Sequence, residues 1–159
     1  MGALLAVVTL SGCGGGGGSD TRTPDKPAAK KAADACKVAT TEEVAAALGS
    51  PAGESAPNGM GDVIRQCDTW NVERDRYVVV QFTSLPVDTT DRPQAQKVAG
   101  VGDAAYFEAG KEDGTLYVRK GSVEFAVAII GVEMTTFTQT PDQMRDSLIP
   151  LARAIASRV

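Results

Sequence analysis

The residue best suited to covalent chemistry in this sequence is Cys13, which follows a short apolar stretch. Residues 1–9 are apolar and uncharged, and Leu10, Ser11 and Gly12 lead from them to the cysteine. A branched apolar residue, two small residues and a cysteine form the pattern of a bacterial lipobox. Small side chains there admit a peptidase, and the thiol can be alkylated by a diacylglycerol group. Acyl chains of that group, such as palmitate, hold a protein to a membrane by burying their methylenes. The pattern predicts cleavage before Cys13 and its lipidation.

The segments on either side of Cys13 are also typical of an exported, membrane-anchored protein. We expect residues 1–12 to be a lipoprotein signal peptide, because they are shorter than the roughly 20 residues that a membrane-spanning helix needs. Basic residues, usual at the start of a signal peptide, are missing, so we expect it to be truncated at its start. Residues 13–34 comprise the lipidated cysteine and a flexible tether rich in glycine and proline. The predicted location is the extracytoplasmic face of the cell membrane.

The remaining cysteines, Cys36 and Cys67, are expected to form a disulfide. The chain has three cysteines, so one of them needs another purpose in an exported protein, and lipidation of Cys13 supplies it. Closing a loop of about 31 residues would stabilise the domain by roughly 3.5–4 kcal/mol in the chain-entropy model. We expect Trp70 to pack near this disulfide. The alternatives are a redox role for the pair and a buried or paired Cys13.

Side chains that commonly carry catalysis or bind metals are scarce. The sequence contains no histidine, so it lacks the commonest general base and the commonest metal ligand. Asp88 with Asp91, and Glu108 with Glu112 and Asp113, are local carboxylate clusters, but neither has the spacing of a calcium loop. The sequence therefore predicts a protein that is not an enzyme, with no catalytic residues, no metal and no cofactor.

Residues 35–159 have the length and composition of a single domain. The 159-residue chain is 43% hydrophobic and 23% charged, with a formal net charge of −4. Acidic and basic residues are mixed, and no basic stripe is present to displace counterions from phosphates, which argues against nucleic-acid binding. We expect a monomer.

Helix signals lie at both ends of this domain. Thr40 and Glu43 have the spacing of a capping box before an apolar run, which predicts a short helix that stops at Gly49. A second cap at Thr140 precedes apolar residues at helical spacing. These residues are Met144, Leu148, Leu151, Ile155 and Val159. Pro150 interrupts them and removes a backbone donor, so we expect a kink or two short helices.

Between the helices, apolar residues in alternation or in short runs predict strands. The predicted strands cover residues 66–72, 77–83, 105–108, 116–119 and 123–130. The last three form a meander with Gly121 in a tight turn, and the final strand is apolar on both faces, so we expect it to be central and covered by a helix. Residues 50–61 are expected to be a loop, and residues 94–99 a helical turn. The predicted fold is α+β, with an antiparallel sheet of about five strands, a short N-terminal helix and a C-terminal helix packed on it.

Several of these segments together resemble a known family. Cys36 is followed by the sequence TTEEVAAALG at residues 40–49, and Cys67 by Trp70; VGDAAY at residues 101–106 comes further along. In this combination the chain resembles the domain-of-unknown-function 3558 family of actinobacterial lipoproteins, over nearly the whole length after the tether. The resemblance implies a secreted, lipid-anchored α+β domain and brings no catalytic residues.

Two functions are consistent with this sequence. The leading interpretation is a membrane-anchored, non-catalytic binding module of the cell envelope, whose partner is an envelope protein or a cell-wall component. The alternative is a carrier of a small or lipidic ligand in a cavity between sheet and helices. An exposed apolar patch favours the first function, whereas a continuous cavity of several hundred Å³ would favour the second.

Overall fold

The computed structural model describes residues 34–58, 65–83, 94–132 and 138–159, which form an α+β domain. Its strands are β1 (Ala52–Pro57), β2 (Gln66–Asn71), β3 (Arg76–Phe82), β4 (Gln96–Lys97), β5 (Ala104–Ala109), β6 (Asp113–Lys120) and β7 (Val123–Gly131). Its helices are α1 (Thr41–Leu48) and α2 (Pro141–Ala156). The strands form one antiparallel sheet of seven in the order β1-β2-β3-β7-β6-β5-β4. The predicted class is confirmed, but the predicted number of about five strands was too small.

Both helices begin at the capping boxes that the sequence predicts. The Thr40 side chain accepts a hydrogen bond from the backbone N–H of Glu43, whose carboxylate accepts from the Thr40 N–H at 2.9 Å. Thr140 and Gln143 repeat this arrangement at the start of α2. Gly49 ends α1 with a φ of 67°, a conformation that glycine adopts at low cost.

The predicted meander is confirmed, and its last strand lies at the middle of the sheet. Gly121 has a φ of 58° in the β6–β7 turn, as a primed hairpin turn requires at its first position. β7 pairs with β3 on one side and with β6 on the other. A strand in this position can bury both faces, which explains its continuous apolar run.

The sheet is longer than predicted because two short strands lie at its edges. Ala52–Pro57, expected to belong to a loop, is strand β1 and pairs with β2 through a register shift between Ala52 and Ser55. Gln96–Lys97, expected to belong to a helical turn, is β4 and pairs with β5. Almost every residue of these strands is exposed, so neither segment carries the apolar alternation from which strands are inferred.

The division of the C-terminal segment into two short helices was wrong, because α2 continues through Pro150. Proline removes the hydrogen bond that would reach the carbonyl of Asp146. Both residues are exposed, so water can solvate that carbonyl. On the opposite side of the helix, the fully buried Leu148, Leu151 and Ile155 belong to the core and hold the helix in place.

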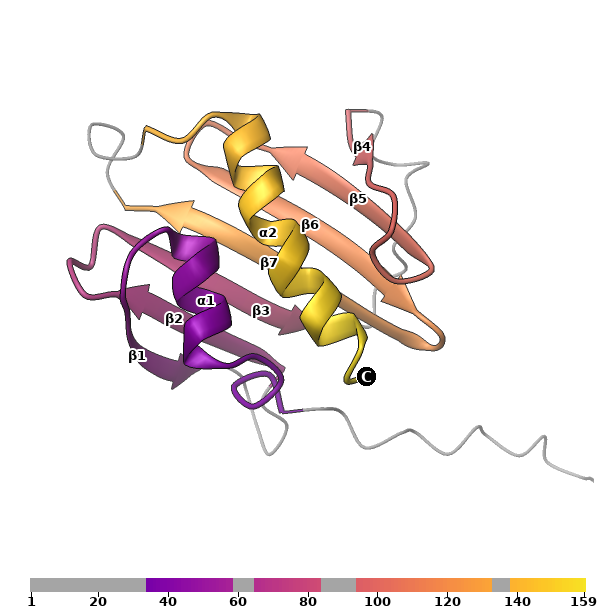
Figure 1. The fold of residues 1–159 in the computed structure, drawn as a ribbon, viewed down its shortest axis with the longest axis horizontal. Helices are drawn as coiled ribbons and strands as arrows, with labels where there is room; N and C mark the ends of the chain where they lie inside the picture. Colours follow the sequence, from indigo (N-terminus) through magenta and orange to yellow (C-terminus); the bar gives the residue numbers. More distant parts are fainter. Residues whose placement is uncertain (1–33, 59–64, 84–93, 133–137) are drawn as a thin grey trace, which may run out of the picture. The chain divides into compact units, whose positions relative to one another are not determined.

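Figure 1 shows both helices on the same face of the sheet, with α2 crossing β6 and β7. The core lies between these two layers. Its largest fully buried side chains include Phe125, Ile129, Leu116 and Leu48. Both described helices lie on this one face (Figure 1), so among the described residues the other face presents mainly side chains of the strands.

Candidate functional site

The predicted anchor lies outside the described residues. Cys13 and the cleavage motif Leu10, Ser11 and Gly12 belong to residues 1–33, so lipidation and cleavage stay predictions. Within the described ranges, no helix is long and apolar enough to cross a membrane.

The expected disulfide between Cys36 and Cys67 is present, with the two Cα atoms 5.0 Å apart. It links the segment before α1 to strand β2. The expectation that Trp70 packs beside it was wrong. Cys67 and Trp70 are three residues apart on one strand, and an odd separation places side chains on opposite faces of a sheet. Cys67 is buried on the helix-covered face, whereas Trp70 lies on the uncovered face.

A small pocket lies beside this disulfide, between the start of α1 and strands β1 to β3. It is lined by the disulfide together with polar and small side chains, among them Thr40, Ser55 and Thr69. Its volume is about 60 Å³, which is room for a few water molecules. Cavities that enclose organic ligands are typically about 300–1,000 Å³. This pocket does not suit a lipid chain.

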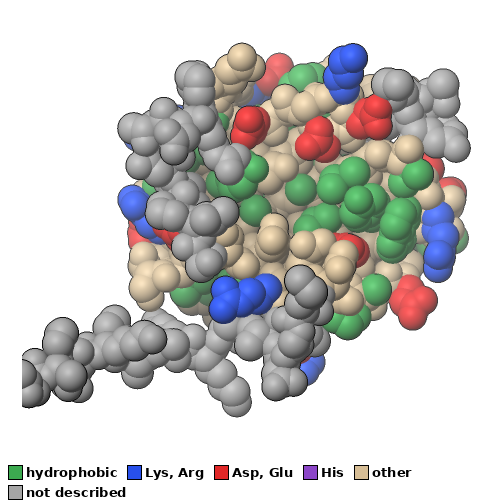
Figure 2. All heavy atoms as spheres, turned by 180° about the vertical axis from the view of Figure 1, so that it is seen from behind, with side chains coloured by type: hydrophobic (Ala, Val, Ile, Leu, Met, Phe, Trp, Pro, Cys, Tyr) green, Lys and Arg blue, Asp and Glu red, His purple; other side chains and the backbone are tan. Residues whose placement is uncertain are grey.

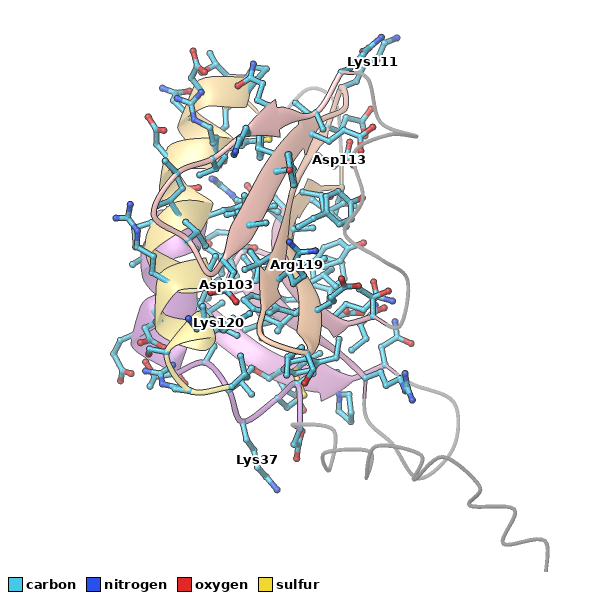
Figure 3. The ribbon with its side chains drawn as sticks, turned by 90° about the vertical axis from the view of Figure 1, so that its right-hand side faces the viewer. Lys37, Asp103, Lys111, Asp113, Arg119 and Lys120 are labelled. Carbon is cyan, nitrogen blue, oxygen red and sulfur yellow. A yellow bond between two sulfur atoms is a disulfide. The ribbon has the colours of Figure 1, made fainter. Side chains whose placement is uncertain are left out.

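One acidic residue near a turn, Asp103, has structural partners. Asp103 accepts hydrogen bonds from the backbone N–H of Gly121 at 2.7 Å and from Lys120 Nζ at 3.1 Å, which hold its pKa below the ordinary range. Asp103 thereby ties the turn before β5 to the β6–β7 turn, and Figure 3 shows it beside Lys120. No set of three potential ligands suited to a metal occurs among the described residues. Asp88 and Asp91 lie outside them.

The candidate site that the structure does provide is the face of the sheet that the helices leave uncovered. Figure 2 views this face and shows hydrophobic side chains gathered on it, with both acidic and basic side chains around them. Strand alternation assigns every second residue of β2, β3, β6 and β7 to it. Three of them, Trp70, Tyr77 and Ile130, are cross-strand neighbours in one row.

We call five residues of this region the apolar patch: Trp70, Val72, Tyr77, Ile130 and Val132. The Trp70 and Tyr77 rings are stacked, with centroids 4.4 Å apart. Val72 is the first residue of the β2–β3 turn and is 63% exposed. Val132, the first residue beyond β7, donates its backbone N–H to the carbonyl of Asp75 in that turn and is 48% exposed. Val72 and Val132 are the two large hydrophobic side chains that stand out as exposed among the described residues. An exposed apolar cluster of this kind marks a possible contact surface.

Carboxylates border the apolar patch on both sides. Asp113 is the cross-strand neighbour of Ile130, and Asp68 lies two residues before Trp70 on the same face. Asp68 accepts hydrogen bonds from the amides of Gln66 at 2.8 Å and Asn58 at 2.9 Å. No ion pair between described residues includes Asp68 or Asp113.

The pKa of the Tyr77 hydroxyl is affected both by burial and by a nearby carboxylate. Partial burial raises the pKa of the Tyr77 hydroxyl above its ordinary value, and the Asp68 carboxylate raises it further. Both effects disfavour the phenolate, so the Tyr77 side chain is a neutral amphipathic group at physiological pH.

A buried asparagine holds the hairpin turn at the end of the apolar patch. The Asn71 amide is 1% exposed and donates to carboxylate oxygens of Glu73 at 2.9 Å and Asp75 at 2.6 Å. Its side-chain oxygen accepts from the backbone N–H groups of Asp75 at 3.1 Å and Arg76 at 3.3 Å. Arg74, in the middle of this turn, has a φ of 57°. The network fixes the turn that separates Trp70 from Tyr77.

The sheet edges are poorly suited to pairing with another strand. β1 has an irregular register and ends in Pro57, which has no N–H to donate. β4, at the opposite edge, is two residues long. The uncovered face therefore offers a better contact surface than either edge.

No protein-family model, curated protein or solved structure matches this chain. Membership of the lipoprotein family that the sequence resembles accordingly stays a prediction.

Proposed function

We propose that this protein is a lipid-anchored, non-catalytic binding module on the extracytoplasmic face of a bacterial cell membrane. The observation that carries the binding role is the apolar patch on the uncovered sheet face, with Val72 63% exposed. Exposed apolar clusters of this kind are used for contact with other molecules. The proposed location at the membrane is supported by the lipobox that ends at Cys13 and by the glycine- and proline-rich sequence that follows it.

The alternative role as a ligand carrier gains no support from the pocket beside the disulfide, because about 60 Å³ is too small for a lipidic ligand. The close packing between α2 and the sheet also argues against a ligand carrier, since Leu148, Leu151 and Ile129 are fully buried there. We therefore propose a surface binder.

Cell fractionation tests the proposed membrane anchor. Cys13→Ser removes the thiol that would receive the diacylglycerol group, so we expect the variant in the medium and the wild type in the membrane fraction with a palmitate label. The matched control replaces Cys36 and Cys67 with serine, which removes the disulfide and leaves the anchor. Membrane retention and labelling of the Cys13→Ser protein would refute the proposed anchor.

Native gel electrophoresis of solubilised membranes tests the surface. The double variant Val72→Asp/Val132→Asp places charges in the apolar patch, and we expect it to run as a smaller species than the wild type. The control Glu42→Gln/Asp146→Asn changes two exposed residues of the helices. A wild type that runs as free monomer, or a complex that the patch variant leaves intact, would count against a binding role for this face.

A further inference from the structure

Cross-strand neighbours on the uncovered face form rows across the sheet, and two of these rows begin with a carboxylate and continue with apolar residues. One row contains Asp113, Ile130, Tyr77 and Trp70 on β6, β7, β3 and β2 in turn. In Figure 3, Asp113 and Arg119 lie on the side of the sheet away from α2. Arg119, a cation of this face, is three rows from Asp113 and has Glu124 as its cross-strand neighbour, so it lies away from the apolar patch.

The neighbouring row places a carboxylate on the other side of the patch. In it, Asp68 is followed by Val79 and Ala128, both of which are 8% exposed. The apolar patch and these two residues thus have Asp68 at one side and Asp113 at the other. Neither carboxylate is in an ion pair with a described residue, and the amides that bind Asp68 position its charge without neutralising it.

From this pattern, and resting on the proposed binding function, we propose that the apolar patch binds a protein segment in which lysine or arginine flanks apolar side chains. Cations on such a segment would complement Asp68 and Asp113, while its apolar side chains would cover Trp70, Val72 and Val132. Charge complementarity of this kind selects the partner and speeds the encounter.

The same charges disfavour other occupants. A second copy of this chain would bring its own Asp68 and Asp113 against the first pair, and the chain has a net charge of −4. Like charges brought together in an interface cost several kcal/mol. An anionic lipid surface or an anionic wall polymer would be repelled in the same way. A neutral glycan would make no use of the two carboxylates.

Trp70 is the only tryptophan of the chain and lies in the apolar patch, so its fluorescence reports on binding there. The full-length protein, in a neutral detergent, is titrated with a tryptophan-free peptide that alternates lysine with phenylalanine and isoleucine. Three further probes are the same peptide with glutamate in place of lysine, a neutral chitin oligosaccharide and phosphatidylglycerol vesicles. We expect a saturable change in Trp70 emission with the lysine peptide only, and weaker binding as salt is raised.

The variant Asp68→Asn/Asp113→Asn keeps the size of both side chains and removes their charges. We expect it to bind the lysine peptide at least about fivefold more weakly than the wild type. The control Glu42→Gln/Asp146→Asn removes two charges from the helices and should bind as the wild type does. Circular dichroism of each variant establishes that it is folded.

Several results would overturn this inference. They are equal binding of the glutamate peptide, a saturable change with the oligosaccharide or the vesicles, no change with the lysine peptide, or equal weakening by the two double variants. The fractionation and native-gel experiments do not depend on the chemistry of the partner. A failure here would therefore leave the proposed binding function to be decided by those experiments.

Discussion

Asn71 shows how one buried side chain holds the end of the sheet on which the apolar patch lies. Its amide satisfies two backbone N–H groups of the β2–β3 turn and two carboxylates at once. A buried N–H without an acceptor costs about 1–3 kcal/mol. The position of Trp70 relative to Tyr77 depends on this turn, because the two residues are its flanking cross-strand pair.

We expect Asn71→Ala to lower the free energy of unfolding by about 1–3 kcal/mol, because it leaves the Asp75 and Arg76 N–H groups without their side-chain acceptor. Urea unfolding followed by circular dichroism measures the difference. Asn58→Ala is the matched control, since the Asn58 amide makes an exposed hydrogen bond to Asp68. Equal losses in the two variants would show that the buried network has no special role.

At the scale of elements, an ion pair connects the two helices that cover the sheet. The Arg158 guanidinium donates to the Glu43 carboxylate at 2.6 Å and 2.7 Å, and to the backbone carbonyl of Val38 at 2.7 Å. The bond from Arg158 is the main cause that holds the pKa of Glu43 below its ordinary value. The end of α2 is thereby fastened to the start of α1.

This pair predicts a dependence of stability on pH. The pKa of Glu43 is lower in the folded chain than in the unfolded chain, where it is about 4.3. The pair therefore stabilises the fold fully above that value, and the stabilisation is lost as pH falls through the depressed pKa. We expect Glu43→Gln, which keeps a capping residue, to be less stable than the wild type at pH 7.

Unfolding curves at pH 7 and at pH 3 measure this effect, and the difference between wild type and variant should shrink at the lower pH. Glu42→Gln, one position earlier on α1, is the control and should show no comparable change. A difference that is equal at both pH values would mean that the charge of Glu43 is not what stabilises the fold.

The disulfide acts between elements as well, because it fastens the segment before α1 to β2 across 31 residues. Replacing both Cys36 and Cys67 with alanine should lower the free energy of unfolding by roughly 3.5–4 kcal/mol, as the chain-entropy model gives for such a loop. Denaturant unfolding measures the loss, and reduction of the wild type should reproduce it. A loss below about 1 kcal/mol would show that the unfolded chain is not restricted by this bond.

Elements with strong local signals could be predicted from the sequence. The caps at Thr40 and Thr140, the turn at Gly121 and the apolar strand β7 all depend on neighbouring residues. β1 could not be predicted, since its exposed sequence acquires strand geometry by pairing with β2. Pro150 did not divide α2, because packing of the buried side of the helix outweighs one lost hydrogen bond.

At the scale of the whole molecule, the candidate site depends on information that no single segment carries. Trp70, Tyr77 and Ile130 belong to three strands, and they become neighbours only when β3 pairs with β2 and with β7. Both described helices pack on the opposite face (Figure 1), so neither helix covers these residues. The apolar run of β7 indicates an apolar second face, but burial of both faces of a central strand produces the same run.

Photo-crosslinking in native membranes tests the central claim, that the uncovered face binds a partner, most directly. A photoreactive amino acid is placed at Val72 in the full-length protein, and a second protein carries it at Glu42, an exposed residue of α1. Mass spectrometry identifies proteins, glycans and lipids attached at each position. We expect a discrete protein adduct from Val72 that is absent from Glu42 and is lost when Ile130→Asp is added. Identical adducts at the two positions, or none at Val72, would contradict the claim.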